Sequence, residues 1–197
     1  MTEFVVFDTE FTAWPGSRER QWSESWEHRE IIQLAAIKVS LIDQQLNITE
    51  SFNELVMPRI NTELSDYVVQ LTGIEQHMLL DLAVDFPSVL TQFRQFCANG
   101  KLPGYSWGND AKVLMENCVL NKLAWPDFPA GLFDIKPLLE DQSIAFMDIN
   151  SGRLASSLGI ELVGKEHNAL HDVRSIVAAL QHWVTQEQLD LSNIISN

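Results

Sequence analysis

Residues 4–10 read FVVFDTE, an apolar run that ends in the carboxylates Asp8 and Glu10. Because the run is rich in β-branched and aromatic residues, it predicts a β-strand. Side chains alternate along a strand, so both carboxylates are expected on one face of the sheet. Two adjacent buried anions are costly unless their pKa values shift or they bind a cation. A metal site is therefore one interpretation, and a solvated strand end is the other.

Two further strands are expected at residues 30–42 and 48–57, so the chain begins with a three-strand meander. Helices then alternate with a short strand at residues 102–107. The expected helices run from a cap at Asn61 or Thr62 to Gly73, from Pro87 to Gly100, from Asn109 onward, and over residues 134–139, 151–158 and 168–185. This order predicts an α/β fold with a mixed sheet flanked by helices.

The 197 residues fit one domain of ordinary size, which we place at residues 1–185 and follow with a docked tail at residues 186–197. No stretch approaches the roughly 18 apolar residues of a membrane span, and the start lacks the basic segment of a secretion signal. A cytoplasmic location without membrane contact is expected. Cys97 and Cys118 lie in apolar helical patterns, which favours buried free thiols over a disulfide or a metal site.

The chain has 13 basic and 27 acidic residues, a formal charge of −14. This charge argues against a processive protein that holds long duplex nucleic acid through its phosphates. It leaves open an enzyme that captures a strand end through bound divalent cations, because such ions reverse the local field.

A second group of polar residues, His167 to Asp172, lies at the start of the expected helix 168–185. His167 precedes the helix, and Asp172 falls on or beside the apolar face marked by Ala169, Val173 and Ile176. An inward aspartate needs a partner. Taken alone, this pattern is weak evidence for a functional site, because an aspartate at a helix start usually interacts with the helix dipole or with solvent.

Taken together, these segments resemble the DEDDh exonucleases, the proofreading-subunit-like branch of the ribonuclease H-like fold. Residues 7–12 resemble the first motif, which ends a strand with D-x-E, and residues 106–110 resemble the second, with Asp110 at a helix start. Residues 167–172 match the third motif, H-x-A-x-x-D. The second strand at residues 30–37 and the T-G-I turn at residues 72–74 also fit, so the resemblance covers residues 4–184 in order.

The resemblance implies a metal-dependent 3′-5′ exonuclease that releases nucleoside 5′-monophosphates. Asp8, Glu10, Asp110 and Asp172 would hold two ions, Mg²⁺ or Mn²⁺, and all four would be catalytic together with His167. His167 would act as general base, since its ordinary pKa suits neutral pH. His171 is the competing base, but the motif assigns this role to the first histidine.

Substrate contacts are expected from residues around the first two motifs: Thr9, Phe11, Thr12, Trp14 and Trp107. The segment 13–29 also carries Trp22 and Trp26 with three arginines, which could stack a base and contact phosphate. Alternatively, these rings only pack the loop onto the domain. Gln33 departs from the family, which commonly has glutamate there.

The expected substrate is a single-stranded 3′ end, with RNA slightly favoured over DNA because the first motif and Trp107 look closest to the histone-mRNA-exonuclease-like branch that trims RNA. DNA proofreading or repair trimming is the second interpretation. A regulatory module that binds nucleic acid or protein on this fold is the third. A homodimer through a helix face or residues 189–195 is compatible with the sequence.

Overall fold

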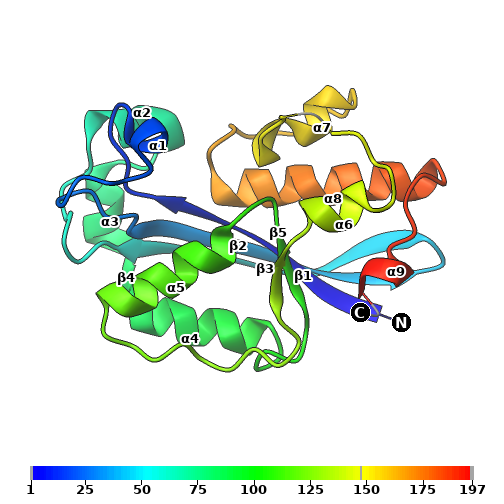
Figure 1. Ribbon diagram of the computed structural model, residues 1–197, viewed down its shortest axis with the longest axis horizontal. Coiled ribbons are helices and arrows are strands. Elements are labelled where there is room, and N and C mark those ends of the chain that lie inside the picture. The colour runs from blue at the N-terminus through cyan, green and yellow to red at the C-terminus, as the bar shows by residue number, and fades with distance from the viewer. Residues whose placement is uncertain (1, 147, 196–197) are drawn as a thin grey trace.

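A six-stranded mixed sheet forms the centre of the molecule in the computed structural model, which describes residues 2–146 and 148–195 (Figure 1). The strands lie in the order β4-β3-β2-β1-β5-β6. β1, β2 and β3 pair antiparallel, whereas β4, β5 and β6 join in parallel. The predicted α/β fold with a mixed sheet and a three-strand meander is confirmed. The strands are β1 (Thr2–Phe11), β2 (Ile31–Ile42), β3 (Gln45–Met57), β4 (Val84–Asp85), β5 (Gly104–Ser106) and β6 (Leu132–Asp134).

Helices cover both faces of this sheet. The long helix α8 packs on one face, and α4 and α5 pack on the other (Figure 1). The helices are α1 (Ser17–Arg20), α2 (Asp66–Thr72), α3 (Gln76–Leu82), α4 (Phe86–Phe96), α5 (Asp110–Leu120), α6 (Lys136–Glu140), η1 (Ser151–Arg153), α7 (Leu154–Ser157), α8 (Ala169–Thr185) and α9 (Ser192–Ile195).

Strand β1 is buried on both faces, because its apolar side chains alternate between two cores. Phe4 and Val6 pack with α8, while Val5 and Phe7 pack with α4 and α5. Burying each such side chain contributes roughly 1.5–3 kcal/mol, which fixes the register of β1. The same alternation directs the even-numbered Asp8 and Glu10 toward α8.

Helix α2 begins at a different cap from the predicted Asn61 or Thr62. Ser65 is the cap, and its hydroxyl accepts a hydrogen bond from the Val68 N–H at 3.1 Å. The Asn61 N–H instead donates to the buried Glu30 carboxylate at 2.5 Å, as do the N–H groups of Arg59 and Ile60. This long-range anchor has no local sequence signal, so the predicted cap was wrong.

Several short elements also differ from the sequence prediction. α3, β4 and β6 were not expected, and the helix predicted from residue 134 begins at Lys136 because Asp134 belongs to β6. α4 ends at Phe96 rather than at Gly100, since Ala98 and Asn99 adopt left-handed backbone conformations. The predicted helix 151–158 is divided between η1 and α7.

The segment after α8 returns to the α8 face of the sheet. Leu189, Leu191 and Ile194 are buried in the same core as α8, and the Tyr105 hydroxyl donates to the Ile194 carbonyl at 3.1 Å. Within the described residues, no helix combines the length and the apolar character needed to cross a membrane.

Candidate active site

Two carboxylates of the site lie on β1. Asp8 is 7% exposed and Glu10 is 8% exposed, so neither is the solvated strand end that was the alternative interpretation. They belong to the same face as Phe4 and Val6, where α8 crosses the strand. The fold therefore buries both acids against the helix that carries the third motif.

Asp110 joins them from the start of α5. Because β5 runs parallel to β1, the loop after β5 returns the chain to the carboxyl end of β1. There one oxygen of Asp110, Oδ1, accepts hydrogen bonds from the Thr9 N–H at 3.1 Å and the Thr9 hydroxyl at 2.5 Å. Thr9 thus attaches Asp110 to the strand that bears Asp8 and Glu10.

Asp172 lies in the first turns of α8 and is 3% exposed. The Ser151 hydroxyl donates to its Oδ2 at 2.9 Å, whereas Oδ1 is buried without a hydrogen-bond partner among the described residues. A Cβ atom added to Gly152 would approach Oδ1 to 2.5 Å. The sequence placed Ser151 and Gly152 in an expected helix and did not mark them as neighbours of the site.

His167 precedes α8 in a left-handed backbone conformation, with φ of 62°. Such a conformation is uncommon outside glycine and is often retained at functional sites. Ligand atoms of Glu10, His167 and Asp172 all lie within 4.8 Å of one another, whereas Asp8 and Asp110 are outside this group. The first and third motifs therefore meet in space.

Gln33 positions the start of α8. Its side chain is buried, and Oε1 accepts a hydrogen bond from the Ala169 N–H at 3.0 Å. Its Nε2 donates to the Asn53 Oδ1 at 2.8 Å. Since Gln33 pairs with Glu10 across β1 and β2, it connects the first motif to the helix of the third. This contribution was not predicted, although the departure from the family residue drew attention to the position.

The carboxylates interact strongly with one another. Burial, followed by the charges of Asp110, Glu10 and Asp172, raises the pKa of Asp8 well above its ordinary value. Burial also raises the pKa of Glu10 and of Asp110, and it raises the pKa of Asp172 to about 6. Burial lowers the pKa of His167, although Glu166 opposes this effect. Without a cation, this centre favours protonated acids and a neutral imidazole.

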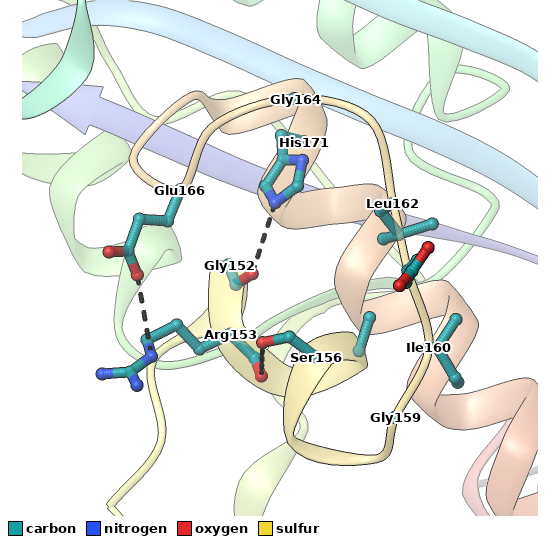
Figure 2. A pocket seen from close by; sticks show the side chains of 11 residues that line it. Gly152, Arg153, Ser156, Gly159, Ile160, Leu162, Gly164, Glu166 and His171 are labelled. Carbon is teal, nitrogen blue, oxygen red and sulfur yellow. Dashed lines mark hydrogen bonds and ion pairs between the residues drawn. The ribbon is translucent and has the colours of Figure 1, made fainter.

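His171 points toward Gly152 of η1 (Figure 2). Its Nε2 lies 3.3 Å from the Gly152 carbonyl oxygen, and its Nδ1 is buried without a partner among the residues described. The ring borders a cavity of about 640 Å³, which Arg153 and Glu166 also line. His171 therefore connects α8 to η1, and the group of converging ligand atoms contains His167 instead.

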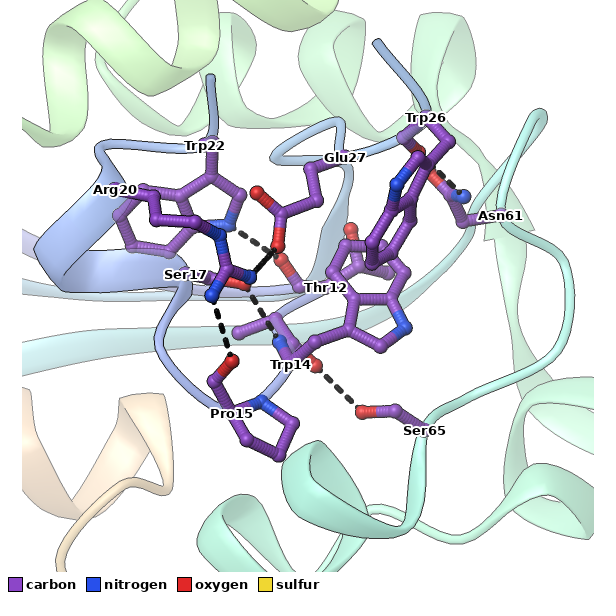
Figure 3. A network of polar contacts seen from close by, with 11 residues as sticks. Thr12, Trp14, Pro15, Ser17, Arg20, Trp22, Trp26, Glu27, Asn61 and Ser65 are labelled. Carbon is purple, nitrogen blue, oxygen red and sulfur yellow. Dashed lines mark hydrogen bonds and ion pairs between the residues drawn. The ribbon is translucent and has the colours of Figure 1, made fainter. Parts of the chain in front are cut away.

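Ring contacts, hydrogen bonds and an ion pair hold the tryptophan-rich segment 13–29 together (Figure 3). Trp14 meets Trp26 edge-on at a ring distance of 4.9 Å, and the Trp22 Nε1–H donates to the Thr12 carbonyl at 3.1 Å. Arg20 forms an ion pair with the buried Glu27, which also accepts a hydrogen bond from Ser17 at 2.8 Å. These contacts give the rings a packing function beside the site.

The other predicted substrate residues are also engaged by the protein. The Thr12 hydroxyl accepts a hydrogen bond from the Glu30 N–H at 3.0 Å and donates to the His28 carbonyl at 2.5 Å. Phe11 is half-buried and meets Trp22 edge-on at 5.5 Å. Trp107 is only 7% exposed, and its Nε1–H donates to the Ile149 carbonyl at 2.9 Å. Little of the Trp107 ring is therefore free.

The donor set fits a hard divalent cation. Carboxylate oxygens are the ligands that Mg²⁺ and Mn²⁺ prefer, and four carboxylates with raised pKa values gain most from a nearby positive charge. The unpartnered Oδ1 of Asp172 is a buried acceptor whose solvation nothing in the described protein replaces. A bound cation would satisfy both needs.

Comparison with solved structures establishes the fold. The nuclease domain of 3′hExo, a DEDDh family member bound to rAMP, has a TM-score of 0.76 and 24% identity, covering 94% of this chain and 92% of that one. A 3′-exonuclease in a structure of histone mRNA stem-loop recognition has a TM-score of 0.77 and 22% identity, covering 94% and 64%. The fold is the ribonuclease H-like fold of the DEDDh exonucleases.

The sequence establishes the family. The exonuclease family matches residues 5–180, and the chain belongs to this family. The 3′-5′ exoribonuclease 1 of Homo sapiens is 28% identical over 156 residues, which cover 75% of this chain. This chain spans 44% of the length of that relative.

Proposed function

We propose that this protein is a metal-dependent 3′-5′ exonuclease that removes nucleoside 5′-monophosphates from single-stranded 3′ ends. The observation that carries the proposal is the buried carboxylate centre beside His167. Asp8, Glu10, Asp110 and Asp172 come from three elements and all have raised pKa values. Such a centre is unfavourable for the fold alone, and membership of the exonuclease family gives it a chemical purpose.

Asp8, Glu10 and Asp172 would bind two divalent ions, Mg²⁺ or Mn²⁺, with Asp110 as a direct or water-mediated ligand. The bound ions would supply Lewis acidity, which activates the attacking water and stabilises charge on the departing 3′ oxygen. Ser151 and Thr9 hold two of the carboxylates in orientation through hydrogen bonds to Asp172 and Asp110. Each acid then retains an oxygen for metal or for water.

His167 would accept the proton of the attacking water. Its lowered pKa keeps the imidazole neutral at pH 7, which is the form a general base requires. Its ring lies close to Glu10 and Asp172, where that water would sit. Thr9, Phe11, Thr12, Trp14 and Trp107 would surround the terminal nucleotide, mainly through backbone and ring edges, since their polar groups and faces are largely engaged.

The substrate we favour is single-stranded RNA over DNA. The support is the human relative named an exoribonuclease, together with the similarity to structures that hold rAMP or a histone mRNA stem-loop. DNA trimming is the competing enzymatic function. A binding module is disfavoured because binding alone does not need four buried carboxylates and a histidine. We place the protein in the cytoplasm, where its buried free Cys97 and Cys118 stay reduced.

The test uses 5′-labelled single-stranded RNA, single-stranded DNA and a blunt duplex, incubated with Mg²⁺ or Mn²⁺ and again with EDTA. We expect stepwise shortening from the 3′ end of the single strands, with RNA shortened faster. Asp8→Ala is expected to remove this activity. Asp81→Ala is the matched control, because Asp81 is an exposed carboxylate on α3 and is not one of the four buried acids.

Cleavage that persists in EDTA, or that Asp8→Ala retains, would refute the metal mechanism. Faster shortening of DNA would instead support the repair-trimming function. Folded protein that binds RNA but cleaves none of the three substrates would support the binding module.

A further inference from the structure

A second cavity opens beside the carboxylate centre. Its volume is about 700 Å³, and it is lined by residues from α1, from the start of α6 and from the segment 148–157. Ser151 is one of these residues, and its hydroxyl donates to Asp172 at 2.9 Å. One wall of the cavity is therefore in direct contact with a proposed metal ligand.

Three cations from distant parts of the sequence line this cavity: Arg18, Lys136 and Arg153. The chain has 13 basic and 27 acidic residues, so an isolated surface cation is expected to find a carboxylate nearby. Within the described part of the chain, no carboxylate oxygen lies within 4.0 Å of the basic nitrogens of Arg18 or Lys136. The cavity thus concentrates positive charge in an otherwise anionic protein.

Segment 13–29 carries three arginines, and only Arg18 lacks a carboxylate partner among the described residues. Its other two arginines are neutralised, Arg20 by Glu27 and Arg29 by Glu116. Arg18 alone among the three faces the cavity. Arg153 is 3.9 Å from Glu166 and 69% exposed, so this ion pair holds it only weakly (Figure 2). Asp148 is the acidic residue among those that line the cavity.

The Trp107 ring forms the wall beside Lys136. Its ammonium lies 5.5 Å from the centre of the Trp107 ring, and that ring meets Phe146 edge-on at 4.8 Å. The Lys136 N–H donates to the Asp134 side chain at 3.0 Å, which fixes the start of α6. Lys136 therefore lies against an aromatic wall, and its charge remains available to a ligand.

We propose that this cavity binds the phosphodiester groups on the 5′ side of the scissile bond. The inference rests on the proposed function, because it takes the strand end to be held at the carboxylate centre. Each upstream phosphate carries one negative charge, which a protein of charge −14 would repel without local cations. Arg18 and Lys136 supply those cations in a cavity whose wall residue Ser151 contacts Asp172. The ligand class is an extended single strand of several nucleotides, so affinity depends on substrate length.

The test measures binding of fluorescein-labelled U12 and UU by anisotropy in Ca²⁺, over a series of salt concentrations, alongside hydrolysis in Mg²⁺. The variant is Arg18→Gln with Lys136→Gln. The matched control is Lys101→Gln with Lys122→Gln, which removes the same charge from exposed sites beyond the cavity. Melting temperatures establish that both variants are folded.

We expect the cavity variant to weaken U12 binding at least tenfold and UU binding much less, whereas the control stays close to wild type. Each lost phosphate contact lowers the slope of log affinity against log salt by about 0.7 for a single strand, so the slope falls by about 1.4. Equal losses in variant and control would overturn the inference. Failure of wild type to hydrolyse either substrate, with this binding difference intact, would refute the exonuclease proposal and leave the strand site standing.

Discussion

His167 combines a strained backbone conformation with the proposed role of general base. Its left-handed conformation, with φ of 62°, directs the ring to Glu10 and Asp172, and burial lowers its pKa. A base works only when deprotonated, and since burial lowers the His167 pKa from its ordinary 6.5, we expect kcat/KM to fall only at a pH below that value. His167→Ala should lose at least ~100-fold in kcat while still binding Mn²⁺.

Turnover and calorimetric Mn²⁺ titration of His167→Ala check this prediction, with His77→Ala as the control because His77 is exposed on α3. Loss of Mn²⁺ binding along with turnover would make His167 a ligand instead of a base. A rate that is flat from pH 5 to 8 would also contradict the assignment.

Gly152 is a second residue whose importance is steric. A Cβ atom here would approach Asp172 Oδ1 to 2.5 Å and the Glu166 backbone Cα to 3.0 Å. We expect Gly152→Ala to displace Asp172 and to reduce kcat more than tenfold, at a stability cost of about 1–3 kcal/mol. Steady-state kinetics and urea unfolding measure the two effects.

Gly159→Ala separates site geometry from general destabilisation. Gly159 has φ of +76° but open space around its Cα, so alanine there costs about 1 kcal/mol in backbone strain. Its kcat should stay near wild type. Equal kcat losses in the two variants would mean that Gly152 acts only through stability.

At the scale of elements, Gln33 shows how β2 controls α8. Removing its acceptor leaves the buried Ala169 N–H unsatisfied, which costs roughly 1–3 kcal/mol. We expect Gln33→Leu to lose this stability and to lower kcat, because the start of α8 also sets His167 and Asp172. Gln33→Glu keeps an acceptor for the Ala169 N–H and should therefore retain most of the stability and most of the kcat.

Chemical denaturation and kcat of the two Gln33 variants provide the measurement, and Gln92→Leu, at an exposed position of α4, is the control. Full activity in Gln33→Leu would show that the Asn168 cap alone is sufficient to place α8.

The elements that the sequence predicted well are those with long apolar periods. β1 and α8 alternate or repeat over many residues, and both were located to within about two residues. Asp8, Glu10 and Asp172 interrupt those periods, but they were nominated as site residues through the resemblance to the DEDDh motifs. β6 and α3 are short, and the Glu30 anchor that displaces the α2 cap joins residues 29–31 positions apart. Local patterns do not encode such contacts. The same holds for Ser151, which reaches Asp172 only through the fold.

At the scale of the whole molecule, the carboxylate centre should make stability depend on pH and metal together. The pKa of Asp172 rises from an ordinary 3.8 to about 6 in the folded protein, and those of Asp8, Glu10 and Asp110 also rise. A folded state with raised carboxyl pKa values binds more protons than the unfolded chain. Its stability is therefore greatest below pH 4 with respect to these groups, and it falls as the pH rises through the folded pKa values.

We accordingly expect metal-free protein to lose stability between pH 5 and pH 8, by roughly 1 kcal/mol for Asp172 alone. Hydrogen bonds from Ser88 lower the pKa of Asp85. Its contribution to stability is therefore complete above pH 4 and does not change between pH 5 and pH 8. The lowered pKa of His167 has the opposite effect, because its contribution to stability grows as the pH rises from the folded pKa up to 6.5 and is complete above that value; it is one group against four. Urea unfolding in EDTA and in Mg²⁺ measures the effect, and Mg²⁺ should stabilise far more at pH 8 than at pH 5. Asp172→Asn should flatten the EDTA profile. Equal stabilisation by Mg²⁺ at both pH values would mean that the cation binds away from the titrating carboxylates.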